Sequence, residues 1–112
     1  MDLEHFAERW IDDWNSHDLD RVISHYANDA EFRSPIAAKR TGSGIVKGHD
    51  ALRAYWRPAF ENRPNLKFHL KSAFVGYRAI SIHYSDELGR NVIETLLFNT
   101  AGQAIFGCGC YA

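Results

Sequence analysis

The chain has 112 residues, 46% of them hydrophobic and 13% aromatic, so it has enough apolar surface to bury one core and is not a disordered chain. Thirteen basic side chains face fourteen acidic ones, for a formal charge of −1, which provides no general attraction to nucleic acid or to an anionic membrane. We therefore expect a single domain over residues 1–112 that has neither partner.

The N-terminus carries Asp2 and Glu4, where a signal peptide would have basic residues followed by an apolar run. No apolar stretch approaches the length of a membrane-spanning helix. These features predict a cytoplasmic protein.

The first predicted helix begins at Leu3, and its apolar residues recur at steps of three and four, the spacing of one helix face. They are Leu3, Phe6, Ala7, Trp10, Ile11 and Trp14. A second helix is predicted after Asp18, whose carboxylate can cap it, with the apolar face Leu19, Val22, Ile23, Tyr26 and Ala27. The break between them is short, so both faces must share one core.

A strand is predicted over Glu31–Ser34, because Pro35 cannot donate a hydrogen bond to a sheet. The segment Ile36–Lys47 has no apolar periodicity and is predicted to be a loop. Its sequence GSGIVKG lacks the spacing of a phosphate-binding loop.

A third helix is predicted from Gly48 or His49 to Arg63, and Pro58 within it predicts a kink or a break. Its apolar face comprises Leu52, Tyr55, Trp56, Ala59 and Phe60. Four strands joined by tight turns follow from Leu66 onward, which predicts an antiparallel meander.

The penultimate strand is apolar on both faces. Val92, Leu96 and Phe98 share one face with Glu94, whereas Ile93 and Leu97 face the other way with Thr95. Because both faces need cover, we expect a homodimer through the outer sheet face.

Three segments, WNSHDLDRVISHYANDAEFRSP, GHDALRAYW and FNTAGQ, occur in an order that resembles the nuclear transport factor 2-like superfamily, which includes SnoaL-like cyclases and ketosteroid isomerase. The resemblance implies an α+β cone, in which three helices are packed in the concave face of a curved antiparallel β-sheet. It also implies an apolar pocket at one end of the cone, and it makes the loop Ile36–Lys47 a flap beside the pocket mouth.

Glu94 is the strongest catalytic candidate, because a carboxylate among apolar neighbours has a raised pKa. The alternative is that Glu94 reaches the rim or pairs with an arginine such as Arg33 or Arg78. Ketosteroid isomerases carry a tyrosine, an aspartate before a proline and a second aspartate where this chain has Trp10, Ser34 and Glu94. Of the three positions, only the last still has a carboxyl group, that of Glu94. The chemistry of ketosteroid isomerase is therefore not expected.

Tyr26 is the predicted hydrogen-bond donor to a bound polar atom, and His69 and His83 are candidate proton relays. No histidine pair has metal-ligand spacing, and no metal is expected. Large rings and one hydroxyl are predicted to contact the ligand: Trp10, Trp14, Ser34, Tyr55, Trp56 and Phe60. Cys108 and Cys110 are interpreted as small apolar residues of a strand, too far apart in regular geometry for a disulfide.

These residues predict a domain that binds an apolar small molecule and, as an enzyme, carries out cofactor-free isomerisation, cyclisation, dehydration or epoxide opening by acid and base catalysis. The alternative is a non-catalytic module for ligand binding or dimerisation, since one fold serves many functions.

Overall fold

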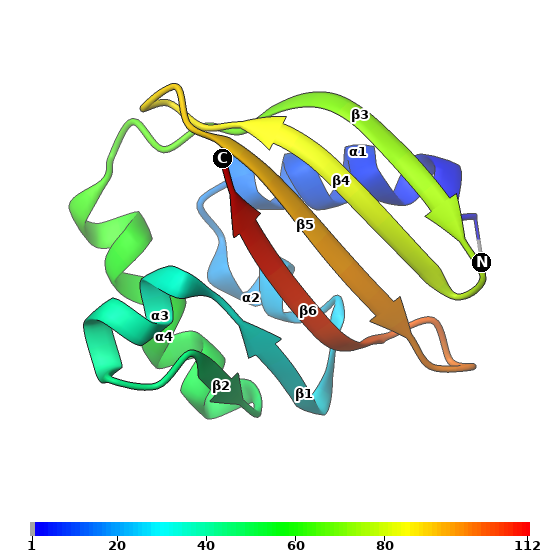
Figure 1. Ribbon diagram of the computed structural model, residues 1–112, viewed down its shortest axis with the longest axis horizontal. Coiled ribbons are helices and arrows are strands. Elements are labelled where there is room, and N and C mark those ends of the chain that lie inside the picture. Colours follow the sequence, from blue (N-terminus) through cyan, green and yellow to red (C-terminus); the bar gives the residue numbers. More distant parts are fainter. Residues whose placement is uncertain (1) are drawn as a thin grey trace.

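The computed structural model describes residues 2–112. Within these residues two helices come first, strands and helices then alternate, and four consecutive strands follow (Figure 1). The helices are α1 (Leu3–Asn15), α2 (Leu19–Ile23), α3 (Pro35–Thr41) and α4 (His49–Asn62). The strands are β1 (Tyr26–Arg33), β2 (Ile45–Lys47), β3 (His69–Gly76), β4 (Ala79–Ser85), β5 (Asn91–Phe98) and β6 (Ala104–Tyr111). None of the helices in this part of the chain is both long and apolar enough to span a bilayer.

Capping residues fix the starts of the first two helices. The side chain of Asp2 accepts hydrogen bonds from the backbone amides at the start of α1, and Asp18 does the same for α2. The residues that α1 buries are those of the predicted apolar face, with the exception of the half-buried Leu3. The predicted packing of α1 and α2 in one core is confirmed.

The second helix is shorter than predicted and the first strand is longer. Helix α2 ends at Ile23, and Tyr26 and Ala27 belong to β1. The apolar spacing that suggests a longer helix is overridden by sheet pairing, because Tyr26 lies opposite Ala104 of β6. A local sequence pattern contains no information about a pairing partner so far away in the sequence.

The prediction of a loop over Ile36–Lys47 is wrong, because the segment contains α3 and β2. The Oγ of Ser34 accepts a hydrogen bond from the amide of Ile36 at 3.1 Å, and Pro35 occupies the first turn of α3, where a missing amide proton costs nothing. Gly42 ends the helix at φ 79°. Strand β2 then pairs antiparallel with β1.

Helix α4 continues through Pro58 without a break. After it, the chain does not enter the sheet at Leu66 as predicted but at His69. Leu66 and Phe68 are nevertheless buried, so the connection between α4 and β3 contributes to the core.

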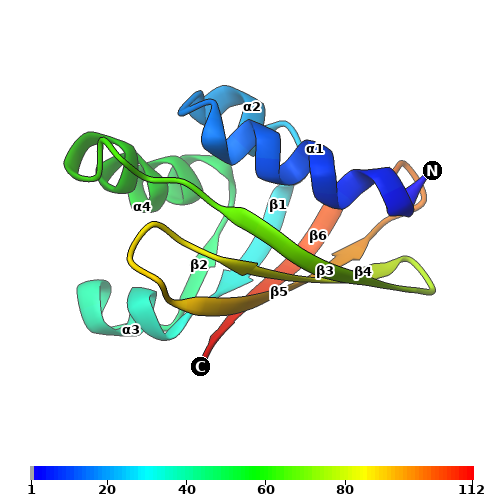
Figure 2. The same ribbon diagram turned by 90° about the horizontal axis from the view of Figure 1, so that it is seen from above.

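The strands form one sheet in the order β2-β1-β6-β5-β4-β3. The meander of β3 to β6 is antiparallel as predicted, whereas β1 and β6 run parallel. Helices α1, α2 and α4 cover one side of the sheet, and α3 lies at its edge toward the other side (Figure 2). The predicted α+β cone with three helices in the concave face is therefore confirmed, with α3 as a fourth helix and with one parallel strand pair.

The alternation predicted for β5 is also confirmed. Val92, Glu94, Leu96 and Phe98 are buried, whereas Ile93 and Leu97 are exposed on the outer face. The inner face of the sheet thus places one carboxyl group in the core.

Candidate functional site

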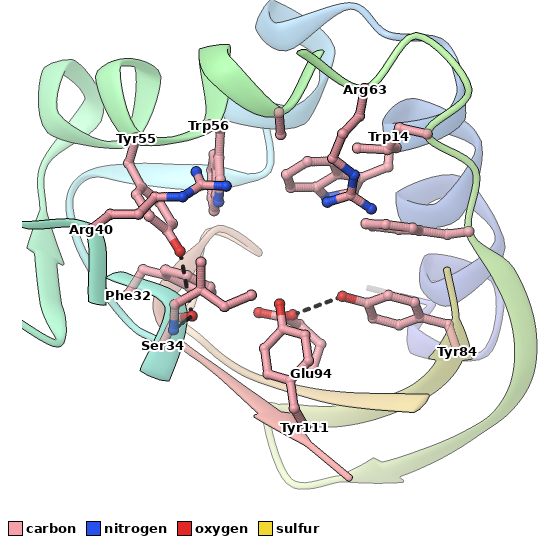
Figure 3. A pocket seen from close by; sticks show the side chains of 14 residues that line it. Trp14, Phe32, Ser34, Arg40, Tyr55, Trp56, Arg63, Tyr84, Glu94 and Tyr111 are labelled. Atoms are coloured by element: carbon pink, nitrogen blue, oxygen red, sulfur yellow. Dashed lines mark hydrogen bonds between the residues drawn. The ribbon is translucent and has the colours of Figure 1, made fainter. Parts of the chain in front are cut away.

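A pocket opens at the end of the cone, between α3, α4 and the inner face of the sheet (Figure 3). Its volume is about 60 Å³, small beside the roughly 300–1,000 Å³ typical of ligand sites. It is lined by Trp14, Phe32, Ser34, Ile36, Arg40, Tyr55, Trp56, Ala59, Arg63, Leu66, Phe68, Tyr84, Glu94 and Tyr111. The walls are mainly aromatic, with a few polar groups directed inward.

Glu94 is the carboxyl group of the pocket, and it is only 4% exposed. Its Oε1 accepts a hydrogen bond from the hydroxyl of Tyr84 at 3.3 Å, whereas its Oε2 has no hydrogen-bond partner within residues 2–112. Burial raises the pKa of Glu94 to about 8, against a smaller opposing effect of the Tyr84 hydrogen bond. Near neutral pH the group therefore holds its proton but is close to releasing it.

The alternative in which Glu94 pairs with an arginine is wrong. Arg33 binds Glu31, with Nε 2.7 Å from the carboxylate Oε2. The guanidinium of Arg78 lies over the ring of Tyr77, 5.2 Å from its centroid. Since neither of these arginines pairs with Glu94, burial favours its neutral form.

Trp14 supplies a second polar atom without a partner. Its indole ring is 6% exposed and packs against Trp56 and Phe68, with ring centroids 5.2 Å away in both cases. Its buried Nε1 finds no hydrogen-bond acceptor in the described part of the chain. Since an unsatisfied buried donor is unfavourable, this N–H is available to an oxygen of a bound molecule.

Ser34 and Tyr55 form a hydroxyl pair on the side of the pocket that α3 borders. The Tyr55 hydroxyl donates to the Oγ of Ser34 at 3.4 Å, and the same Oγ caps α3. This position thus provides a helix cap and not the carboxylate that ketosteroid isomerases have there.

Three further polar side chains line the pocket: Arg63, Arg40 and Tyr111. Arg63 is bound by Glu87 through two hydrogen bonds of 2.6 and 2.7 Å, which raise the pKa of Arg63. Arg40 lies over the ring of Tyr55 at 5.7 Å, with its guanidinium directed over the pocket (Figure 3). Burial raises the pKa of Tyr111 to about 12.

Comparison with known proteins agrees with this geometry. The SnoaL-like domain family matches residues 7–92. The chain belongs to the SnoaL-like family. A SnoaL-like protein from Burkholderia thailandensis, known from a crystal structure, has 34% sequence identity to this chain. The aligned region covers 97% of this chain and 92% of that protein's chain, with a TM-score of 0.94. No curated protein sequence matches.

Two more distant structures share the fold of this SnoaL-like chain. One is an NTF2-like protein from Burkholderia pseudomallei, 16% identical, with 100% of this chain and 92% of that chain covered and a TM-score of 0.80. The other is SalBIII, described as an epoxide hydrolase/cyclase-like enzyme in pyran ring formation in salinomycin. It is 11% identical, with 100% and 95% covered and a TM-score of 0.76.

The pocket of the SnoaL-like chain brings together five of the predicted site residues, namely Glu94, Trp14, Ser34, Tyr55 and Trp56. The other five predicted residues do not line it: Tyr26, Trp10, Phe60, His69 and His83.

Each of those five residues either makes contacts away from the pocket or is exposed on a strand. Tyr26 is fully buried and its hydroxyl accepts from Trp10 Nε1 at 3.3 Å, so neither is free for a ligand. Phe60 packs on Trp14 from outside the pocket, at a centroid distance of 5.4 Å. His69 is exposed on β3, and His83 lies on the outer sheet face with its Nε2 3.1 Å from Asn91 Oδ1.

Sequence reasoning missed several pocket residues, chiefly Tyr84, Tyr111, Arg40 and Arg63. A signal for Tyr84 is present, because it follows Ile80 and Ile82 in the alternation of β4 and so faces the core. The contribution of Arg40 depends on α3, which was predicted as a loop. Within residues 2–112 no group of three or more His, Cys, Asp or Glu side chains is arranged to hold a metal.

Proposed function

We propose that this SnoaL-like chain binds a small, mainly apolar organic molecule in the pocket and transfers a proton to or from it without a cofactor. The reaction class is isomerisation, cyclisation, dehydration or epoxide opening. Glu94 is the acid or base of the step, and the indole N–H of Trp14 donates a hydrogen bond to an oxygen of the substrate.

The observation that carries the proposal is a buried carboxyl group with one oxygen free and a pKa raised to about 8. Proton transfer is most effective when the pKa of the catalytic group lies near the working pH. A carboxyl group that served only to hold the fold would instead be paired with a cation or fully hydrogen-bonded.

The polar groups suggest how a substrate is oriented. An oxygen that accepts from Trp14 Nε1 lies in the same aromatic pocket as the free Oε2 of Glu94. A carbonyl, hydroxyl or epoxide oxygen meets that requirement, while the rings of Trp56 and Phe32 contact the apolar body. The related fold of SalBIII, which acts in pyran ring formation, is consistent with such chemistry.

The small volume of the pocket adds a condition. A ligand larger than a few heavy atoms must displace side chains, and Arg40 and Tyr111 are the most exposed of those that line the pocket. We propose that these two move when the ligand enters.

The test uses a panel of small cyclic ketones and cyclic epoxides. Binding is followed by tryptophan fluorescence and turnover by mass spectrometry. Glu94→Gln keeps the shape of the side chain, so it should bind the probes within about threefold of the wild type and lose roughly 100-fold or more in turnover. Glu61→Gln, which changes an exposed carboxyl group of α4 outside the pocket, is the matched control.

The alternative function is a non-catalytic ligand-binding module. It is favoured by Ser34, which caps α3 at the position where a ketosteroid isomerase has its base. Binding of the probes with no turnover, or with equal turnover in the wild type and Glu94→Gln, would establish this alternative. If no probe binds to either protein, the pocket is not a ligand site and both functions fail.

We further propose that two copies of the chain associate through the outer sheet face. On that face Phe74 is 68% exposed, Ile93 46% and Leu97 41%, and apolar side chains exposed together on one face are typical of an interaction surface.

A further inference from the structure

Two cysteines lie side by side on the outer face of β6, away from the pocket. Cys108 and Cys110 alternate with glycines, so both thiols point to the same side of the strand. Their Sγ atoms are 3.8 Å apart, and both thiols are free, Cys108 half-buried and Cys110 exposed. The structure therefore presents two sulfur ligands at close range.

A disulfide between these cysteines would disturb the sheet. Residues two apart on a strand have Cα atoms about 6.5 Å apart, near the upper limit for a disulfide. Strand β6 is paired on both sides, with β1 through Cys108 and with β5 through Cys110. It therefore cannot contract locally without breaking pairs, so the thiols remain available to bind something between them.

The distance between the sulfurs matches one kind of ligand. A metal ion about 2.3 Å from each of two sulfurs that lie 3.8 Å apart subtends an angle of about 110°. This is the tetrahedral angle that Zn²⁺ and related d¹⁰ cations adopt with thiolates. The pair has this spacing without any movement of the backbone.

The surroundings leave room for such an ion. Cys108 and Cys110 border an open apolar groove, which they share with Pro35, Ala38 and Ile45. Arg33 lies opposite Cys108 in the sheet, but its charge is compensated by Glu31, 2.7 Å away. A cation that binds two thiolates is thus not repelled by a net positive neighbour.

We propose that Cys108 and Cys110 form a two-thiolate site for a soft d¹⁰ cation of the zinc class. Binding replaces two S–H bonds by two metal–sulfur bonds and releases two protons to the solvent, with no oxidation or reduction. Residues 2–112 offer no cluster with a third ligand, so the remaining two coordination positions face the groove and take water or a small ligand.

The experiment titrates Cd²⁺ into the reduced, untagged full chain and follows the ultraviolet charge-transfer absorption of cadmium thiolates. One Cd²⁺ should bind per chain with the absorbance of two thiolates, and excess Zn²⁺ should remove the band. Cys108→Ser and Cys110→Ser should each weaken binding at least tenfold, because each leaves a single thiolate. His69→Asn removes an exposed imidazole from β3, an edge strand that β4 and β5 separate from β6, and should leave the affinity unchanged.

The proposal is overturned if the wild type gives no band, or if each single variant keeps half of the absorbance at the wild-type affinity, which would mean two independent thiols. A homodimer through the outer sheet face could cover the cysteines. The variant Leu97→Lys, which is designed to separate the two copies of the chain, tests this. Equal binding by this variant and the wild type supports the site, whereas binding only by the variant overturns it for the protein as it exists.

Discussion

Glu94 is buried in the core, which disfavours its charged form, and this affects the stability of the whole fold. Its folded-state pKa of about 8 lies above the ordinary value of 4.5 for a glutamate, so the folded chain holds the proton more tightly than the unfolded one. The stabilisation is complete below the unfolded pKa and is lost as the pH rises from about 4.5 to about 8. Glu94→Gln removes this loss and should raise the free energy of unfolding at pH 7 by roughly 3 kcal/mol.

Thermal or urea unfolding at several pH values measures the effect. The difference between Glu94→Gln and the wild type should shrink toward zero or change sign near pH 4, where the wild-type carboxyl group is neutral in both states. Glu61→Gln should follow the wild type throughout. A variant that is less stable than the wild type at pH 7 would show that the carboxylate is ionised and paired, contrary to the structure.

Tyr84 provides a second prediction for the same group. Its hydroxyl donates the hydrogen bond that Oε1 accepts, and this bond favours the ionised form of Glu94. Tyr84→Phe should therefore raise the pKa of Glu94 further and extend the pH range over which stability is lost to higher values, while the lower end of the range stays at the unfolded pKa. Carboxyl titration by infrared or NMR spectroscopy measures this pKa, and a lower value in the variant would contradict the assignment.

Among the secondary-structure elements, α3 has a start signal in the sequence that can also be interpreted as the end of a strand. Ser34 and Pro35 are a typical helix start, with a capping hydroxyl followed by proline in the first turn. The same proline also fits a strand end, and the local pattern does not decide between the two. Only one of the seven residues of α3, Ala37, is buried. The segment therefore has no apolar periodicity from which a helix could be predicted.

The cap of α3 can be tested by Ser34→Ala. Loss of the hydrogen bond to the amide of Ile36 should lower the free energy of unfolding by about 1 kcal/mol. Chemical unfolding measures the difference. Ser24→Ala is the matched control, because the exposed Ser24 hydroxyl donates to a carbonyl and caps no helix start. Equal effects of the two substitutions would show that Ser34 does not cap α3.

Tyr26 marks the limit of local reasoning about the site. Its position fits the helical spacing that begins with Leu19, and its phenol is predicted to donate to a ligand in the pocket of the cone. Pairing with Ala104 turns it into a strand residue whose hydroxyl binds Trp10. The inner-face position of Glu94 follows from strand alternation, which depends only on neighbouring residues. The position of Tyr26 depends instead on a contact across most of the chain.

For the whole molecule, the exposed apolar residues of the outer sheet face lead to a prediction about assembly. Leu97 is 41% exposed between two strands of this face, and a charge there should prevent two sheets from packing together. Light scattering at micromolar concentration should give a dimer for the wild type and a monomer for Leu97→Lys.

Leu88→Lys places the same charge on an apolar residue that is 64% exposed in the turn after β4. This control should remain dimeric. A monomeric mass for the wild type would refute the proposed association, and a dimeric mass for Leu97→Lys would place the contact on another surface.

The sheet order has a consequence for how the protein is made. Strand β6 is last in the sequence, yet it lies between β1 and β5. Synthesis proceeds from the N-terminus at about 5–20 residues per second, so β1 and its short neighbour β2 exist for seconds before their partner has been translated. Until Ala104–Tyr111 emerges, the nascent chain holds two separate fragments of sheet, each with an unpaired edge that a holdase chaperone can bind. Pairing of Ala104–Tyr111 on both of its edges thus determines whether the two fragments join into one sheet.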